Sequence, residues 1–245
     1  MALKDKTILI TGAARRIGRS LALSLAQAGA GVIIHYGGSQ AEAESLQAEI
    51  LRLGGTAHLL QADLNDPTQV EQLIPRALEC LPPGATLFGL INNASIFEAL
   101  DWNQTDLPAW ERHLRINLTT PFLLSQAFAR ALPQDAQGRI VNLLDWRALR
   151  PGADHFPYTI SKAGLAALTR SLAQALAPRI TVNGLALGAI LPPSNGQDTQ
   201  GILQFVPAKR WAELDEVART MIFLLDGPDY INGEIIHLDG GRHLV

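Results

Sequence analysis

The chain has few of the features that mark specialised protein classes. It has one cysteine, Cys80, so no disulfide can form within it, which favours a reducing compartment. Its 20 basic and 23 acidic residues give a net charge of −3, so no excess of positive charge attracts nucleic acid or an anionic membrane. No apolar run approaches the ~20 residues that span a bilayer. Because the six histidines also lack metal-ligand spacing, we expect no metal, nucleic acid or membrane partner.

The chain also lacks a charged-then-apolar leader, since Met1 to Lys6 runs directly into an apolar strand pattern. We therefore expect a cytoplasmic protein. A hydrophobic content of 47% is enough to bury the core of one α/β domain. No repeat or linker interrupts residues 1–245, which are predicted to form a single domain. The segment Pro192–Gly201, rich in proline, serine, asparagine and glycine, is the one expected mobile loop.

Short apolar runs alternate with longer segments of helical periodicity along the whole chain. The predicted strands are Thr7–Ile10, Val32–His35, His58–Gln61, Leu87–Ile91, Ile140–Leu143, Thr181–Leu185 and Glu234–Leu238. The predicted helices are Ile17–Ala28, Ala41–Leu53, Pro67–Leu81, Pro108–Leu132, Tyr158–Ala177 and Glu213–Leu225. Such alternation predicts an α/β fold of the three-layer Rossmann type, a doubly wound, seven-stranded parallel sheet with helices on both faces.

A glycine-containing turn, residues 11–18 (TGAARRIG), joins the first predicted strand to the first predicted helix. In such a unit, backbone N–H groups and the helix N-terminus can face a pyrophosphate. Gly12 permits the tight turn, Gly18 lets the helix approach the strand, and Arg16 stands where a middle glycine is usual. In this position the turn favours a dinucleotide site over a plain strand–helix connection.

The residues after the second strand choose between the two nicotinamide cofactors. An enzyme that uses NAD normally has an acid there for the ribose 2′-hydroxyl, but residues 35–39 are HYGGS and the first acid is Glu42. Ser39, the backbone near Gly37 and Arg15 could instead bind a 2′-phosphate. Ser39 also begins a capping-box pattern with Glu42, and the two roles are compatible because a helix N-terminus favours phosphate. The pattern therefore predicts NADP(H).

Two further segments are expected at the carboxyl edge of the sheet. Asp63 follows the third strand and could meet the adenine edge, or could be an exposed turn residue. Residues 92–95 (NNAS) end the fourth strand, at the edge where this fold places ligands. Their small side chains would let the cofactor lie close to the chain.

Tyr158 and Lys162 are four positions apart and share one face if the segment is helical. A tyrosine with a pKa near ~10 is a poor acid–base group at neutral pH unless a nearby cation favours its anion. Lys162 could supply that cation, and an oxidised nicotinamide would add another. Asn117 falls in the middle of a predicted helix and could bind a water that links Lys162 to solvent. In this order along the chain the residues favour a catalytic group over a solvated helix face.

An aspartate, Asp145, precedes this pair. An ionised carboxylate only accepts hydrogen bonds and would oppose the alkoxide that forms when a carbonyl is reduced. A C=N bond instead needs a proton at nitrogen as its carbon gains hydride. A neutral Asp145 could donate that proton, and an ionised one could stabilise a cationic iminium or bind ring N–H groups. Either way, the residue favours a C=N substrate.

These features together resemble the short-chain dehydrogenase/reductase superfamily, from about Thr7 to residues 239–244 (DGGRHL). Members of the superfamily usually have a serine where this chain has Asp145. Within it, the chain resembles the pteridine reductases and the bacterial dihydromonapterin/dihydrofolate reductases. That resemblance rests on Arg16 in the glycine turn, His35-Tyr36, residues 92–97 (NNASIF), Asp145 and the Tyr158/Lys162 pair.

The resemblance implies that a pterin stacks between the nicotinamide and Phe97, although a loop aromatic packed on the core is the alternative. It also implies that Arg16 and Ser95 reach both the cofactor phosphates and the substrate, and that Asp145 acts with Tyr158 as proton donor or relay. The implied cofactor contacts are Gly12, Arg15, Arg16, Ile17, Gly18, His35, Tyr36, Gly37, Ser39, Asp63, Leu64, Asn93, Ala94, Ser95, Tyr158, Lys162, Gly188 and Ile190. The implied substrate contacts are Arg16, Ser95, Phe97, Asp145 and Tyr158.

The long helices Pro108–Leu132 and Tyr158–Ala177 carry more apolar residues than one sheet face needs, and by resemblance they pack against symmetry mates in a homotetramer. Three departures from the family pattern concern the ligand loops. Residues 186–188 are ALG rather than a Pro-Gly motif, no basic residue follows His35-Tyr36, and residues 191–206, which should cover the substrate, match no pattern.

Three functions are open on this evidence. The first is an NADPH-dependent reductase of a pterin-like C=N bond, converting a dihydropterin or dihydrofolate to its tetrahydro form. The second is an NADP-dependent carbonyl reductase or alcohol dehydrogenase in which Asp145 accepts a hydrogen bond from another small substrate. The third is a catalytically idle nucleotide-sensing or interaction protein on the same fold, against which the intact Tyr158/Lys162 pair argues.

Overall fold

The computed structural model describes residues 3–192 and 201–245. In these residues seven strands form one sheet in the order β3-β2-β1-β4-β5-β6-β7, and the neighbouring strands pair in parallel. The strands are β1 (Thr7–Ile10), β2 (Gly31–Tyr36), β3 (Thr56–Gln61), β4 (Leu87–Asn92), β5 (Gly138–Asp145), β6 (Ile180–Leu187) and β7 (Ile235–Leu238). The predicted doubly wound parallel sheet is confirmed.

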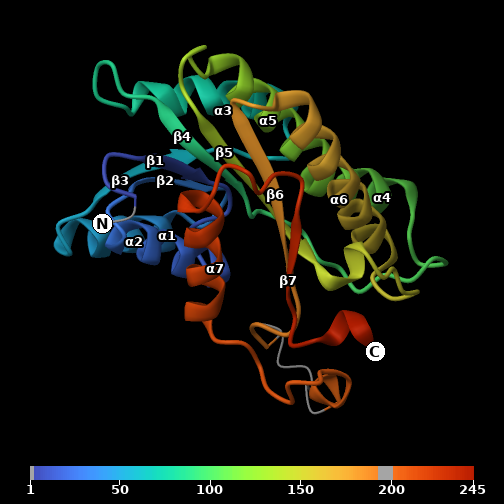
Figure 1. The fold of residues 1–245 in the computed structure, drawn as a ribbon. Coiled ribbons are helices and arrows are strands. Elements are labelled where there is room, and N and C mark those ends of the chain that lie inside the picture. Colours follow the sequence, from blue (N-terminus) through green and yellow to red (C-terminus); the bar gives the residue numbers. More distant parts are fainter. Residues whose placement is uncertain (1–2, 193–200) are drawn as a thin grey trace.

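Helices cover both faces of the sheet (Figure 1). Helices α1, α2 and α7 lie on one face and α3, α5 and α6 on the other, while α4 packs beside α6. The α-helices are α1 (Arg16–Gln27), α2 (Gln40–Arg52), α3 (Pro67–Glu79), α4 (Leu107–Leu114), α5 (Thr120–Ala131), α6 (Phe156–Leu176) and α7 (Leu214–Asp226). The shorter helical turns are η1 (Arg115–Thr119), η2 (Trp146–Ala148), η3 (Ile202–Phe205) and η4 (Arg242–Leu244).

The apolar runs read as strands are buried on both sides, as expected for a parallel sheet between two helical layers. In β1, Ile8 and Ile10 face the layer of α1 and α7, whereas Leu9 faces the layer of α3 and α5. All three side chains are fully buried. Because successive side chains of a strand point to opposite faces of the sheet, each strand contributes to two separate hydrophobic cores, one on each face.

The helix predicted over Pro108–Leu132 is not continuous, which corrects the prediction. It consists of α4, the wider π-helical turn η1 and α5. Pro121 has no N–H group, so it cannot donate to the carbonyl four residues earlier, that of Asn117, and its ring crowds that carbonyl. The helical turn at this point takes in one extra residue, and π-helical turns of this kind are common next to functional sites.

The predicted capping box at Ser39 is also wrong. Ser39 is the N-cap residue of α2, but its hydroxyl makes no capping hydrogen bond, and its backbone (ψ 56°) is not the extended one that such caps need. A capping box does occur at α7, where Glu213 and Glu216 bond to each other's backbone N–H groups.

The segment predicted as a mobile loop, Pro192–Gly201, lies outside the described residues except for its two ends. Within residues 3–192 and 201–245, none of the helices combines the length and the apolar character needed to cross a bilayer.

Candidate active site

The strand order reverses between β1 and β4, which lie side by side although they are far apart in sequence. In doubly wound folds ligands bind in the crevice outside the carboxyl ends of the strands at such a point. The glycine turn leaves the carboxyl end of β1, and residues 92–95 leave that of β4. Asp145 is the last residue of the neighbouring strand β5, so the residues predicted to act together do come from one edge of the sheet.

The turn after β1 has backbone geometry that explains its two glycines. Gly12 has a φ of +63°, and a Cβ there would lie 3.0 Å from the Ala94 Cα. A Cβ on Gly18 would lie 2.3 Å from the Gly12 carbonyl oxygen, so α1 approaches the turn this closely only with glycine at that position. Arg16 also has a positive φ, 54°, and keeps the left-handed conformation at a cost of about 1–2 kcal/mol. Its guanidinium donates to the carbonyl of Pro192 (3.0 Å).

His35 and Asn93, both predicted to contact the cofactor, make side-chain hydrogen bonds within the protein. The buried His35 ring accepts from the Gly12 N–H at Nδ1 (3.0 Å) and donates from Nε2 to the Ala62 carbonyl (3.1 Å). Burial lowers the pKa of His35 to about 4, so the ring is neutral at physiological pH. The Asn93 amide donates to the carbonyls of Thr11 and Gly12 (2.8 and 3.0 Å). These two side chains hold the glycine turn in place, and their contacts with the cofactor stay a prediction.

Two arginines stand at the open end of α1, beside a shallow hollow of about 430 Å³. Arg15 lies 3.5 Å from the Glu42 carboxylate on α2, and both side chains are exposed. The N-terminus of α1 adds its own positive electrostatic potential. The hollow therefore has the charge that a phosphate requires. It is lined by Ala14, Arg15, Arg16, Arg19, Ala41, Glu42 and Ser45.

The other predicted cofactor residues on this side lie at the ends of β2 and β3. Tyr36 ends β2 half-buried, and the exposed Gly37 follows it. Asp63 is exposed, and its Oδ1 accepts from the Asn65 N–H (2.9 Å). It is thus an exposed turn residue, and its contact with adenine stays a prediction. Leu64 is buried, and its carbonyl accepts from a threonine hydroxyl of α5 (3.0 Å).

On the opposite side, the chain passes very close to itself at Gly188, where a Cβ would lie 2.5 Å from the Asp239 Cα. Ile190 is buried in the same core layer that Ile17 packs against. The glycine retained in residues 186–188 is thus required by this close approach, although the usual Pro-Gly motif is absent.

Tyr158 and Asp145 are in direct contact. The buried Tyr158 hydroxyl donates to Asp145 Oδ2 at 3.2 Å. Lys162, one turn further along α6, is also buried and donates from Nζ to the Leu143 carbonyl at 2.7 Å. Its ammonium nitrogen lies 5.8 Å from the centre of the Tyr158 ring.

The electrostatics of this group differ from the prediction. Burial, followed by the charge and hydrogen bond of Asp145, raises the pKa of Tyr158 well above 10. The charge of Arg147 opposes this shift. Burial lowers the pKa of Lys162 to about 8, while the charge of Asp145 opposes that change. Tyr158 therefore keeps its proton at neutral pH, because desolvation disfavours the charged forms of both groups.

Arg147 is a site residue that sequence reasoning missed. Its backbone N–H donates to Asp145 Oδ1 (2.8 Å), and its guanidinium lies 3.4 Å from the same oxygen. The guanidinium also donates to Asp154 (2.7 Å), and this hydrogen bond is the largest cause that lowers the pKa of Asp154 to about 2. The available signal was a basic residue two positions after the aspartate, but nothing in the sequence shows which way it points.

Phe97 lies beside the tyrosine and is half-exposed, so it is not packed into the core as the alternative reading had it. Its ring is edge-on to Tyr158, with centroids 4.6 Å apart and an interplanar angle of 82°. The imidazole of His155, a second residue that sequence reasoning missed, stacks on Phe97 at 4.1 Å and 10°. An accessible aromatic face next to an acid–base group can hold a flat ring.

The side chain of Asn117 is bonded within the protein. It is fully buried, and its Nδ2 donates to the Ile96 carbonyl and to Ser161 Oγ, both at 3.0 Å. Its Oδ1 accepts from Ser95 Oγ (3.1 Å) and from the Ile96 N–H (3.0 Å). The amide is thus fully used in tying the segment after β4 to α6, and a water link from Asn117 to Lys162 stays a prediction.

Comparison with known proteins is consistent with this geometry. The chain matches the family described as short chain dehydrogenase over residues 6–202. A 3-oxoacyl-[acyl-carrier-protein] reductase from Synechocystis is 34% identical over 244 residues, 98% of each sequence. Among solved structures, FolM alternative dihydrofolate reductase 1 from Brucella canis, complexed with NADP, has a TM-score of 0.91 at 38% identity and covers 100% of this chain and 97% of its own.

A short chain dehydrogenase from Burkholderia cenocepacia, solved in complex with NADP, also superposes with a TM-score of 0.91. It is 34% identical to this chain, and the match covers 99% of both. The family match extends over most of the chain, and the relatives are similar over nearly their whole length. The chain therefore belongs to the short-chain dehydrogenase family.

Proposed function

We propose that the protein is an NADPH-dependent reductase of a pterin-like C=N bond, which converts a dihydropterin or dihydrofolate to its tetrahydro form. One observation carries the proposal: the Tyr158 hydroxyl donates to the Asp145 carboxylate where a carbonyl reductase would present a neutral hydroxyl. An arginine-paired carboxylate accepts hydrogen bonds and so suits a substrate with ring N–H groups. The exposed Phe97 ring beside it suits a flat heteroaromatic ring, as the stacked imidazole of His155 illustrates.

Each residue has a defined part in this chemistry. NADPH, when bound, supplies hydride to the carbon of the C=N bond. Tyr158 is protonated at neutral pH and donates the proton that the nitrogen gains, and Asp145 accepts from N–H groups of the substrate ring. Lys162, whose pKa is about 8, is placed to return a proton to the buried site.

The cofactor preference rests on the charge near α1. Arg15 and Arg16 border the hollow at the start of that helix, and no acid follows β2 before Glu42. This arrangement supports a 2′-phosphate more than a free ribose hydroxyl. The NADP complexes of the Brucella and Burkholderia proteins support the same choice.

The second candidate is an NADP-dependent carbonyl reductase, which the 3-oxoacyl-[acyl-carrier-protein] reductase relative favours. Asp145→Ser separates the two. Under our proposal this change lowers dihydrofolate reduction by about 10²-fold, while reduction of an activated ketone such as ethyl acetoacetate holds or rises. Asp135→Ser, at an exposed position, is the matched control. Loss of ketone activity with dihydrofolate activity untouched would favour the second candidate.

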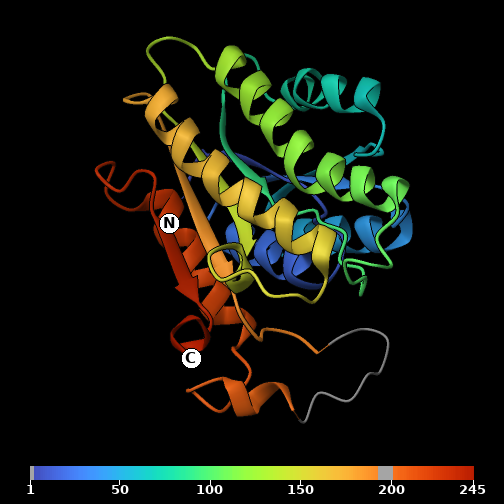
Figure 2. The same cartoon turned by 90° about the vertical axis from the view of Figure 1, so that its right-hand side faces the viewer.

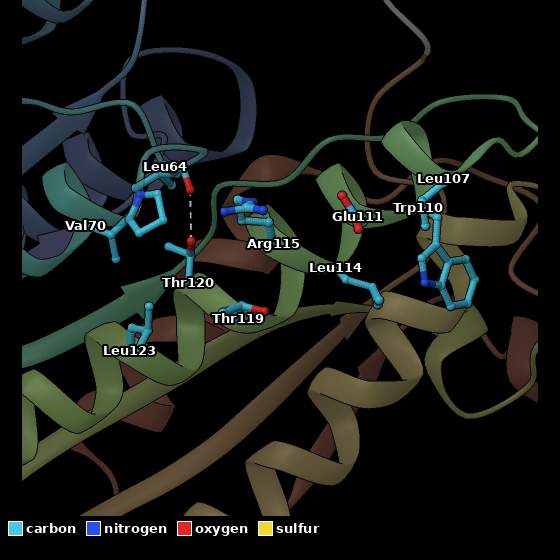
Figure 3. Close-up of a pocket in the computed structure, with 11 residues that line it drawn as sticks. Leu64, Val70, Leu107, Trp110, Glu111, Leu114, Arg115, Thr119, Thr120 and Leu123 are labelled. Atoms are coloured by element: carbon cyan, nitrogen blue, oxygen red, sulfur yellow. Dashed lines mark hydrogen bonds between the residues drawn. The ribbon is translucent and has the colours of Figure 1, made fainter.

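The proposal includes a homotetramer in the cytoplasm. A hollow of about 510 Å³ lies between the start of α3 and the segment α4, η1 and α5, and its lining includes Leu64 of the predicted cofactor contacts but no predicted catalytic residue. Figure 3 shows the side chains of Trp110, Leu114 and Leu123 around it. Helices α5 and α6 run side by side on this part of the molecule (Figure 2). This apolar surface supports burial against a second copy, and a monomeric mass by light scattering at micromolar concentration would contradict it.

A further inference from the structure

Arg147 lies between two carboxylates at the catalytic group. Its side chain is 12% exposed. One end of its guanidinium lies 3.4 Å from Asp145 Oδ1, and the other donates to Asp154 Oδ2 at 2.7 Å. A largely buried arginine with two carboxylate partners is strongly held, because each charge compensates the desolvation of the other.

Arg147 contacts only one of the two carboxylate oxygens of Asp145. Oδ1 accepts from the backbone N–H of Arg147 at 2.8 Å and faces its guanidinium, whereas Oδ2 accepts only from Tyr158 among these groups. The carboxylate cannot turn without losing the backbone bond and the ion pair together. Its free edge is thereby directed at the tyrosine hydroxyl.

The second partner of Arg147 belongs to the segment that leads into α6, the helix that carries Tyr158. Asp154 Oδ2 also lies 3.1 Å from Nδ1 of His155, the residue stacked on Phe97. Arg147 therefore connects the end of β5 to the start of α6 and, through Asp154 and His155, to the ring of Phe97. The titratable and charged groups around it are Asp145, Asp154, His155, Tyr158, Lys162 and Arg242.

We infer that Arg147 is a positioning residue that holds the Asp145 carboxylate as an acceptor beside Tyr158 and so sets the preference of the site for C=N over C=O substrates. The inference deepens the proposed function and rests on it. Of the two roles open to Asp145 in the sequence, acceptor and proton donor, the contacts of Arg147 support the acceptor. Both the backbone N–H and the guanidinium of Arg147 face Oδ1, so Oδ2 is the oxygen left to accept from the tyrosine hydroxyl and from a substrate N–H.

Three variants test this inference. Arg147→Met removes the charge and keeps most of the length, Arg147→Lys keeps the charge, and Arg150→Met removes a charge from an exposed arginine nearby as a control. Turnover of dihydrofolate and of ethyl acetoacetate is measured with NADPH from pH 5 to 9, together with the Kd for NADPH and the Tm.

We expect Arg147→Met to lower kcat for dihydrofolate at pH 7 by about tenfold or more and to raise the ratio of ketone turnover to dihydrofolate turnover. Arg147→Lys should restore most of the dihydrofolate activity, and Arg150→Met should match the unaltered enzyme. NADPH affinity should stay within about twofold in all three. An unchanged kcat for dihydrofolate in Arg147→Met, or an equal loss with both substrates that lysine fails to rescue, would overturn the inference.

A measurement without substrate separates this inference from the proposed function. The chain has three tyrosines, so the ¹³Cζ NMR signal of Tyr158 can be assigned with Tyr158→Phe and followed against pH. The signal reports the hydrogen bond from the tyrosine hydroxyl to Asp145 Oδ2, so its chemical shift should change in Arg147→Met and not in Arg150→Met. If this change is seen but dihydrofolate is not reduced, the proposed function fails and the role of Arg147 stands. If the signal does not move in Arg147→Met, the role of Arg147 fails whatever the substrate.

Discussion

His35 makes the stability of the glycine turn depend on pH. The folded protein holds its ring neutral, because burial lowers the pKa from 6.5 to about 4 and Nδ1 must accept from the Gly12 N–H. The unfolded chain takes up the proton near pH 6.5. Between these two values the unfolded state binds more protons than the folded state, so the free energy of unfolding falls as the pH falls. The contribution is complete above pH 6.5 and is lost as the pH drops to about 4.

The size of the effect follows from the shift. The His35 pKa is 6.5 in the unfolded chain and about 4 in the folded protein. At about 1.4 kcal/mol per pKa unit, this difference lowers the free energy of unfolding by about 3 kcal/mol between pH 7 and pH 4. In His35→Asn the amide oxygen can still accept from Gly12, but the side chain cannot titrate. The free energy of unfolding of this variant should therefore lack that part of the decline.

The assay is urea unfolding followed by circular dichroism at pH 4 to 8 and constant ionic strength. The difference in unfolding free energy between His35→Asn and the unaltered protein should change by about 3 kcal/mol across the range. His58→Asn, on the neighbouring strand β3, shows what loss of an imidazole from the sheet does in general. A difference that stays constant within about 0.5 kcal/mol from pH 4 to pH 8 would refute the reasoning.

Three other changes test the rest of the site. Tyr158→Phe should lower kcat by about 10²–10⁴-fold with NADPH binding nearly intact, because only the proton donor is lost, and a variant that keeps most of its kcat would contradict the mechanism. NADPH should bind at least ~10-fold tighter than NADH, a difference of about 1.4 kcal/mol in binding free energy, and Arg15→Ala should reduce this difference. Equal affinities of the unaltered protein for the two cofactors, measured by fluorescence titration, would contradict the cofactor assignment. Gly18→Ala places a Cβ 2.3 Å from the Gly12 carbonyl oxygen, so it should lower the free energy of unfolding by about 1–3 kcal/mol and weaken NADPH binding. Gly201→Ala is the control, because a Cβ there meets nothing within 4 Å. An unchanged Tm in Gly18→Ala would show that the turn can relax.

Local patterns were sufficient for most of the fold and for the location of the site. The strand and helix patterns alternate without interruption, and buried parallel strands leave a continuous apolar signature that local sequence records. The pattern also located the tyrosine–lysine pair on one helix face. It missed the π-helical turn η1 inside the helix predicted over Pro108–Leu132, although Pro121 was visible, because helical periodicity does not register one extra residue in a turn.

The sequence by itself determined which chemical groups are present and which edge of the sheet they reach, since alternating strands and helices indicate a parallel sheet whose strands end at the same edge. Only the tertiary structure decided how those groups are used. His35, Asn93 and Asn117, which the sequence offered as ligand or relay residues, bond to backbone carbonyls and N–H groups from distant segments. Arg147 and His155 enter the site because η2 and the segment before α6 turn back over Asp145. The reason is that hydrogen bonds and ion pairs depend on direction and on partners far apart in the chain, and neither is encoded in periodicity or spacing.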